Sequence, residues 1–114
     1  VFLDAAERGA ALSLSRGLLA AADACDAGER SGAVLEGIVA AEAAEMDGVD
    51  IEYAALADAA AAARIPRLDR TAFLAVAARV GATRLIDNVW LGPEGTIDRG
   101  QWLDHPSVLY EERQ

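Results

Sequence analysis

The stretch TAFLAVAARVGATRLIDNVW, residues 71–90, decides the fold because it contains two apolar runs joined by a glycine. In the first run the apolar residues are too crowded for a strand with one solvated face, so we expect a strand buried on both faces. Gly81 supplies the permissive backbone that a tight reversal requires. The second run, residues 84–89, mixes apolar and polar side chains. The stretch therefore predicts a β-hairpin at the centre of a small sheet.

A long helix is expected before the hairpin, over residues 5–27. Asp4 and Glu7 have the spacing of a capping box, and Gly28 is a suitable helix end. Five residues at spacings of three and four predict one buried stripe, namely Ala11, Leu14, Leu18, Ala22 and Cys25. Cys25 is therefore expected to be a small core residue rather than a nucleophile.

A second helix is expected over residues 32–46, with Ser31 as its cap. Its predicted apolar side comprises Val34, Leu35, Ile38 and Val39. Its predicted solvated side comprises Glu36, Glu42 and Glu45. Together the two helices are expected to cover the sheet that contains the hairpin.

The segment between the second helix and the hairpin predicts a strand, a short helix and a loop. Residues 49–53 alternate between apolar and polar side chains, which indicates a half-exposed strand. Residues 57–63 are nearly all alanine, which favours a short helix capped by Asp58 and ended before Pro66. A basic loop follows, with the three arginines Arg64, Arg67 and Arg70.

The residues after Leu91 differ in composition from the rest of the chain. Residues 92–95, with the sequence GPEG, predict a turn, and the tail over residues 92–114 is mostly polar. A last short helix is expected at residues 107–112, begun by Pro106. His105 is the only histidine, and it is expected to be exposed rather than to bind a metal.

The order of the predicted elements indicates an α+β fold, because strands follow helices without a regular βαβ alternation. We expect a two-layer domain in which a three-stranded antiparallel sheet carries helices packed on one face. At 114 residues the chain has room for one domain only.

Charge and composition exclude several classes of function. The net charge of −9 disfavours binding to nucleic acid or to an anionic membrane surface. All ten basic residues are arginine, so the chain has neither a Schiff-base lysine nor a P-loop lysine. The single cysteine excludes an intramolecular disulfide and a cysteine metal cluster. A cytoplasmic location and a bacterial source are expected.

The polar residues of the hairpin are the first candidates for a functional site. Arg84, Asp87 and Asn88 interrupt an apolar strand that follows Gly81. Two interpretations stay open. Asp87 or Asn88 satisfies backbone donors or pairs with a neighbouring arginine, which is a structural role. Alternatively, the set contacts a second domain when the two close together.

The basic loop is the second candidate. Arg64, Arg67 and Arg70 either balance the acidic surface as solvated side chains or contact an anionic ligand. No pattern in the sequence brings a histidine, acid and nucleophile together. We therefore assign no catalytic residue and no metal ligand to this chain.

Two motifs in the chain resemble the C-terminal domain of pantoate–β-alanine ligase, which is also called pantothenate synthetase. The first is Phe2-Leu3-Asp4 followed by Arg8, which is similar to the start of that domain. The second and more specific motif is AARVGATRLIDN, residues 77–88, which is similar to the family's ending A-A-R-x-G-x-T-R-L-I-D-N. The resemblance covers residues 1–91, and the tail over residues 92–114 has no matching motif.

The resemblance implies an ATP- and magnesium-dependent ligase that condenses pantoate with β-alanine through a pantoyl adenylate. In that family an N-terminal nucleotide-binding domain performs the chemistry and the C-terminal domain is a lid. The resemblance therefore implies that residues 1–91 are a lid, that the chain alone binds no cofactor and is inactive, and that its partner is the N-terminal domain. We also expect the isolated chain to self-associate. The alternative is a free-standing, non-catalytic interaction module that reuses this fold.

Overall fold

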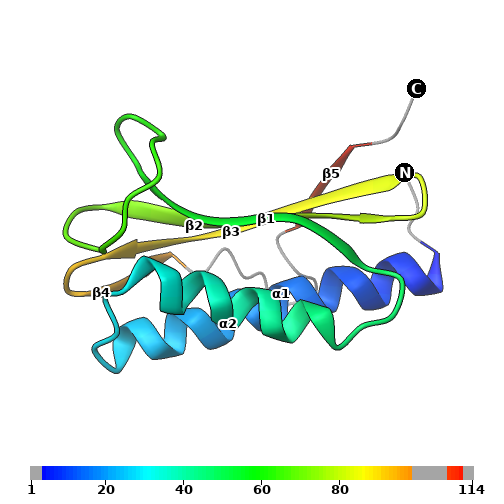
Figure 1. Ribbon diagram of the computed structural model, residues 1–114, viewed down its shortest axis with the longest axis horizontal. Coiled ribbons are helices and arrows are strands. Elements are labelled where there is room, and N and C mark those ends of the chain that lie inside the picture. Colours follow the sequence, from blue (N-terminus) through cyan, green and yellow to red (C-terminus); the bar gives the residue numbers. More distant parts are fainter. Residues whose placement is uncertain (1–3, 99–107, 112–114) are drawn as a thin grey trace.

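Two helices and an antiparallel sheet form the two layers of the molecule, and both helices lie on the same face of the sheet (Figure 1). The computed structural model describes residues 4–98 and 108–111. Its elements in chain order are α1 (Ala5–Asp26), α2 (Gly32–Ala44), β1 (Asp50–Asp58), β2 (Ala72–Val80), β3 (Thr83–Gly92), β4 (Gly95–Asp98) and β5 (Val108–Glu111). The predicted α+β class, with helices packed on one face, is confirmed.

The predicted hairpin is confirmed as β2 and β3, which pair in register along the whole of β2. Gly81 lies in the turn with φ +62°, a conformation that residues with a Cβ atom rarely adopt. Residues 74–78 of β2 are buried without interruption, as the crowding of apolar residues in this run predicts. The hairpin therefore places β2 at the centre of the sheet.

The sheet has five strands, so the prediction of three was too low. Its order is β1-β2-β3-β4, and β5 also pairs with β3. Trp90 lies opposite Asp98, and Asp87 lies opposite Val108, so β4 and β5 follow one another along the same edge of β3. The predicted helix at residues 107–112 is wrong, because Val108–Glu111 is strand β5. Pairing with β3 provides hydrogen bonds that a helix of about one turn lacks.

α1 begins as the sequence predicts. The Asp4 Oδ1 atom accepts a hydrogen bond from the Glu7 backbone N–H at 2.7 Å, and the Asp4 N–H donates to Glu7 Oε1 at 2.9 Å. These two bonds form a complete capping box. The helix ends at Asp26, and Gly28 follows with φ +111°. The predicted stripe is buried throughout, including Cys25.

α2 begins at the predicted cap, where the Ser31 Oγ atom accepts from the Val34 N–H at 3.3 Å. Two assignments of its sides were wrong. Val34 is 44% exposed, whereas Glu36 is only 8% exposed. The buried side of α2 comprises Gly32, Leu35, Glu36, Val39 and Ala43, at helical spacings that include Glu36.

The predicted helix over residues 57–63 is absent, because β1 extends through Asp58 in its place. Ala57 and Asp58 pair with β2 opposite Phe73 and Ala72. Asp58 does not cap a helix but closes a turn, in which its Oδ1 atom accepts from the Ala60 N–H at 2.7 Å. Pairing with β2 therefore outweighs the helix propensity of the alanines.

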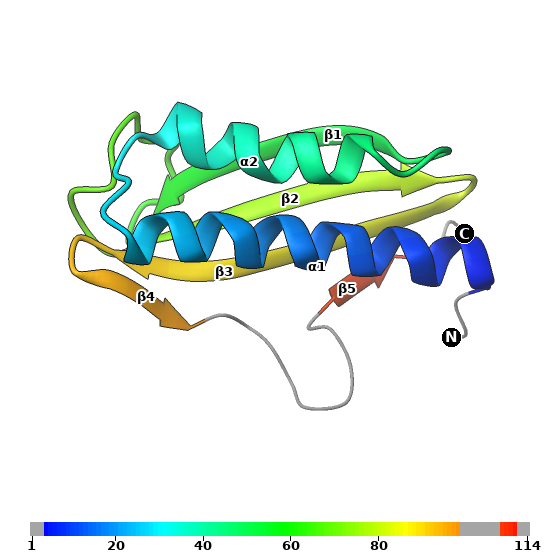
Figure 2. The same cartoon turned by 90° about the horizontal axis from the view of Figure 1, so that it is seen from below.

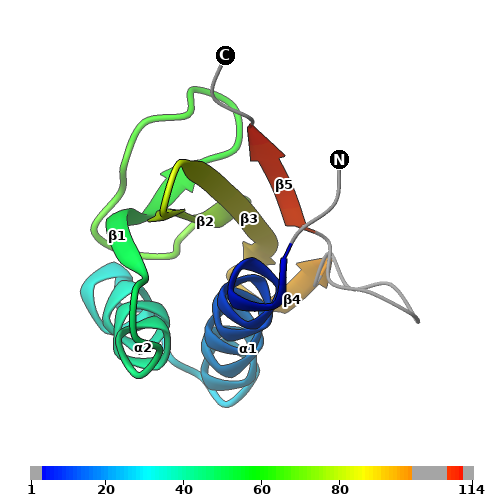
Figure 3. The same ribbon diagram turned by 90° about the vertical axis from the view of Figure 1, so that its right-hand side faces the viewer.

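The core lies between the helices and one face of the sheet (Figure 2). Its largest fully buried side chains come from both helices, from the loop before β2 and from β1, β2 and β3, and they include Leu14, Leu18, Leu35, Leu56, Leu68, Leu74, Leu85 and Leu91. The helices approach closely at Gly17, where a Cβ atom would lie 3.0 Å from the Val39 carbonyl oxygen. One face of the sheet is therefore filled by α1 and α2, and neither of these helices covers the other face (Figure 3).

Candidate functional site

The polar residues of β3 divide between the two faces of the sheet. Asp87 points to the helix side with Leu85 and Val89, and it is 2% exposed. Its Oδ1 atom accepts from the Asn88 backbone N–H at 2.8 Å, as the structural interpretation predicts. Arg84 and Asn88 lie on the opposite face, because side chains alternate along a strand. The three predicted residues therefore do not form one site.

Arg84 belongs to a cluster with Glu52 and Arg79 near the turn at Gly81. The Nε atoms of Arg84 and Arg79 each donate to Glu52, at 2.7 Å from its Oε1 and Oε2 atoms respectively. Glu52 reaches both arginines because the strand has a β-bulge between Ile51 and Tyr53. The hydrogen bond from Arg84 is the main cause that lowers the pKa of Glu52; partial burial opposes it, and the bond from Arg79 adds to it.

The predicted basic loop is largely engaged inside the chain. Arg64 pairs with Glu36, and Arg70 pairs with Asp69 and Asp58. Arg67 is exposed and has no ion pair within the described residues. Because two of the three guanidinium groups are neutralised by partners, the loop is not a preformed site for an anion.

The two predicted sets of residues lie at opposite ends of the sheet. We call the end with the Gly81 turn the hairpin end, and the end where the loop of residues 59–71 meets α2 the loop end. From the Arg79–Arg84 pair to the Phe73–Trp90 pair the register advances six positions, or about 20 Å. Arg84 and the loop arginines therefore do not share one small ligand.

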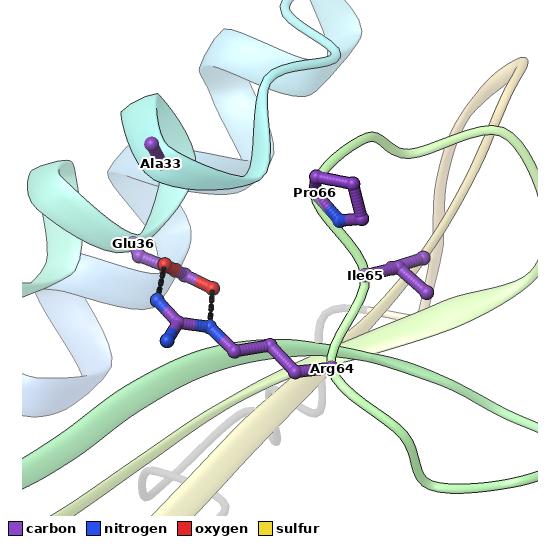
Figure 4. Close-up of a pocket in the computed structure, with 5 residues that line it drawn as sticks. All are labelled: Ala33, Glu36, Arg64, Ile65 and Pro66. Atoms are coloured by element: carbon purple, nitrogen blue, oxygen red, sulfur yellow. Dashed lines mark hydrogen bonds and ion pairs between the residues drawn. The ribbon is translucent and has the colours of Figure 1, made fainter.

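The described residues contain a shallow cavity of about 340 Å³ at the loop end, lined by Ala33, Glu36, Arg64, Ile65 and Pro66 (Figure 4). The Glu36 Oε2 atom accepts from the Leu56 backbone N–H at 2.9 Å and from Arg64 Nε at 3.1 Å. Its Oε1 atom accepts from Arg64 Nη2. Burial raises the pKa of Glu36, but the bonds from Arg64 and Leu56 outweigh it, so the pKa is lowered.

The Glu36–Arg64 pair joins α2, β1 and the loop, and it was missed by the sequence interpretation. The signal was present, because Glu36 has helical spacing with the buried residues Gly32 and Val39. Both oxygens of the carboxylate are already bonded inside the chain. We therefore assign this cavity a structural role.

The face of the sheet opposite α1 and α2 is the larger candidate surface. Nine register positions from β1, β2 and β3 form three rows on it: Tyr53–Ala77–Ile86, Ala55–Ala75–Asn88 and Ala57–Phe73–Trp90. We call these nine positions the open face. None of the nine residues is charged, and the Glu52 cluster borders the first row.

Alanines occupy the middle of the open face and its corner at Ala57, and larger residues occupy the other corners. Ala57, Ala75 and Ala77 are at most 9% exposed, whereas Tyr53 is 43% and Trp90 is 37% exposed. The rings of Phe73 and Trp90 contact each other with centroids 5.5 Å apart. Asn88 is the one residue of the open face that carries a side-chain amide. Within the described residues this amide has no hydrogen-bond partner.

Other candidates for chemistry give no site within the described residues. Cys25 is buried in the core, and burial raises the pKa of its thiol. No three histidine, cysteine, aspartate or glutamate side chains gather closely enough there to hold a metal ion. His105 lies outside the described residues. None of the described helices has the length and apolar character needed to span a membrane.

The fold and these surfaces define a two-layer α+β domain. One sheet face carries nine contiguous uncharged positions bordered by the Glu52 cluster, and most of the loop arginines are engaged internally. The chain belongs to the pantoate–β-alanine ligase family, whose family model matches residues 1–90. The resemblance of the motif at residues 77–88 to this family is thereby confirmed.

Relatives with known names support this membership. The bifunctional pantoate ligase/cytidylate kinase of Gloeobacter violaceus is 45% identical over 94 residues, which cover 81% of this chain and 18% of the relative. The pantothenate synthetases of Geobacter sp. strain M21 and Geobacter sulfurreducens are 40% and 39% identical, over 81% and 82% of this chain. This chain spans about a third of those synthetases.

Proposed function

We propose that this chain is the lid domain of an ATP-dependent pantoate–β-alanine ligase. In the reaction of that family, pantoate attacks ATP to give pantoyl adenylate and pyrophosphate, and β-alanine then displaces AMP. The observation that carries the proposal is the family match over residues 1–90 of a chain that spans about a third of the synthetases it resembles.

The described residues do not fit a site for ATP and magnesium. They contain no group of three carboxylate, histidine or cysteine side chains that could hold a metal ion, and the chain has no lysine to contact phosphates. Arg64 and Arg70 are already paired with carboxylates. We therefore place the adenylation step in a nucleotide-binding domain outside this chain, and we expect the 114 residues alone to be inactive.

The role left for this chain is to cover the reaction. A lid excludes water from a reactive acyl adenylate, which would otherwise be hydrolysed before the amine of β-alanine attacks it. A rigid two-layer domain with one uncovered face fits this role, because the filled face keeps its shape while the other face contacts a partner.

A chimeric enzyme tests the proposal. In it, the present chain replaces the matching third of the Geobacter sulfurreducens synthetase, and pantothenate formation is measured with ATP, Mg²⁺, pantoate and β-alanine. We expect the chimera to be active and the isolated chain to release no AMP. A folded but inactive chimera would overturn the lid role, and AMP release by the isolated chain would overturn the assignment of chemistry to another domain.

The alternative function is a free-standing interaction module. The coding sequence upstream of Val1 separates the two. A reading frame that continues into a nucleotide-binding domain supports the lid, whereas a start codon at Val1 favours the module and requires a search for partners.

A further inference from the structure

We propose that the open face, rather than the helix layer, is the surface that docks against the nucleotide-binding domain of the same enzyme. This inference rests on the proposed function and adds to it the contact surface and the kind of partner. The occupant of the open face is an apolar part of that domain that also presents a hydrogen-bonding group to Asn88.

The two outer surfaces of the molecule differ in charge and in the placement of their exposed apolar residues. The helix layer is bordered by exposed acids, including Asp4, Asp23, Asp26, Glu45 and Asp47, and its exposed apolar residues Leu12 and Val34 lie on different helices. The open face has nine contiguous register positions without a charge, and the Glu52 cluster borders them at the hairpin end. Its exposed apolar area comes mainly from Tyr53 and Trp90, which share one face, whereas Leu12 and Val34 are scattered over two helices.

Side-chain size varies across the open face in a way that suits a partner. Four of the nine positions are alanine, and the row Ala55–Ala75–Asn88 crosses the middle of the face. Small side chains allow the backbone or side chains of a partner to come close to the sheet. Tyr53 and Trp90 stand at opposite corners and supply the aromatic area that anchors many interfaces.

Asn88 is the one residue of the open face that carries a side-chain amide. Its amide offers donors and an acceptor in the middle row of an otherwise apolar surface. Within the described residues this side chain has no partner. A partner that covers the face must therefore bring a peptide or hydroxyl group to this position, because an amide buried without a hydrogen bond is unfavourable.

Two observations favour a domain of the same enzyme over a second copy of this chain. The synthetases that this chain resembles are about three times as long as the matched region, so they contain the protein that such a face would need. In addition, each copy has a net charge of −9, and two copies would repel each other on approach. The family match over residues 1–90 includes all nine positions of the open face.

Photo-crosslinking in the chimeric enzyme described above tests the docking surface directly. The photoreactive residue p-benzoylphenylalanine is introduced in place of Tyr53 on the open face or in place of Leu12 on α1. These two sites are matched, because their exposures are 43% and 45%. We expect crosslinks from position 53, and not from position 12, to peptides of the nucleotide-binding domain in the same polypeptide, identified by mass spectrometry.

A pair of substitutions provides an independent readout. Ala75→Glu places a charge in the middle row of the open face, and Leu12→Glu places the same charge on the helix layer. We expect Ala75→Glu to lower kcat at least tenfold and Leu12→Glu to leave it unchanged, with circular dichroism confirming that both chimeras are folded. If Ala75→Glu does not fold, the crosslinks from position 53 still test whether the open face is the docking surface.

The outcomes distinguish this inference from the proposed function. An active chimera with crosslinks only from position 12 overturns the docking surface and leaves the lid role intact. Crosslinks from position 53 to a second copy overturn the choice of occupant. A folded chimera without activity overturns the lid role, and this inference with it.

Discussion

The two ends of the sheet each hold a glutamate that accepts hydrogen bonds from arginine, yet the surroundings of the two carboxylates differ. At the loop end, Glu36 is 8% exposed and bonds the Leu56 N–H together with Arg64. At the hairpin end, Glu52 bonds Arg79 and Arg84 at the surface, next to the uncovered face of the sheet. The Glu36 carboxylate exchanges water for backbone and arginine donors and so stabilises the fold. The Glu52 carboxylate stays in contact with water and is less constrained.

The difference between the two glutamates indicates that the loop end is held more firmly than the hairpin end. The loop end fixes the loop to α2 through several bonds, including those from the Gly32 N–H to the Pro66 oxygen at 2.9 Å and from the Leu68 N–H to the Arg30 oxygen at 2.8 Å. The hairpin end has a turn at Gly81 with open space around it. We therefore expect substitutions at the loop end to affect stability and those at the hairpin end to affect it less.

The largest effect is expected for Glu36→Ala. The substitution leaves the Leu56 N–H without its carboxylate partner inside the fold and releases Arg64. We expect the free energy of unfolding to fall by about 2 kcal/mol, in the range for a buried donor that loses its acceptor. Urea denaturation followed by circular dichroism measures the change.

Glu42→Ala is the matched control on the same helix. Glu42 pairs with Arg16 at 3.7 Å, and the two side chains are 37% and 59% exposed. We expect a change of no more than about 0.5 kcal/mol. Equal losses for the two variants would show that the Glu36–Arg64 pair has no special structural role.

Local signals in the sequence predicted the parts of the fold that neighbouring residues determine. The capping box at Asp4 and the reversal at Gly81 depend on a few consecutive residues, and both are confirmed. The helix expected over residues 57–63 failed because its alternative, pairing of Ala57 with Phe73, joins residues that are distant in the sequence. Propensity carries no information about such a partner.

The candidate site was harder to predict for the same reason. The sequence indicated Arg84 and Asn88 as candidates, but not the partner of Arg84, because Glu52 reaches it through a bulge that leaves no mark in composition. By contrast, strand alternation alone predicts that Asp87 and Asn88 lie on opposite faces, as they do. The helical spacing of Glu36 with buried residues could have predicted its burial, but we assigned every glutamate of α2 to the solvated side.

A pair of glycine substitutions in α2 is expected to give the next largest effect, with opposite signs. A Cβ atom at Gly32 would lie 2.9 Å from the Ile65 oxygen and 3.1 Å from the Pro66 oxygen, which are backbone atoms of the loop. We expect Gly32→Ala to destabilise the fold by about 1–2 kcal/mol, as overpacking does. A Cβ at Gly37 meets nothing within 4 Å, so Gly37→Ala should stabilise the fold by about 0.5–1 kcal/mol.

Urea denaturation of both glycine variants beside the parent chain decides whether the contact of the loop with α2 is steric as well as electrostatic. A stabilising Gly32→Ala would show that the loop moves away easily. In that case the loop end would be less tightly packed than the hydrogen bonds of Gly32 and Glu36 indicate.

The smallest expected effect concerns pH and separates the two glutamates most finely. Both pKa values are lowered in the folded chain, so each carboxylate stabilises the fold above the ordinary glutamate pKa of about 4.3. That stability is lost as the pH falls through the lowered folded pKa, because the unfolded chain then binds more protons. Glu36→Gln and Glu52→Gln should each reduce the loss of stability as the pH falls below about 5, since each removes one titrating carboxylate.

In about 0.5 M NaCl the contribution of Glu52 should disappear because solvent and salt screen a surface cluster, whereas the contribution of Glu36 should persist. Unfolding free energies measured from pH 7 to pH 3 at low and high salt test this, and an equal response of the two variants to salt would contradict the contrast between the two ends of the sheet.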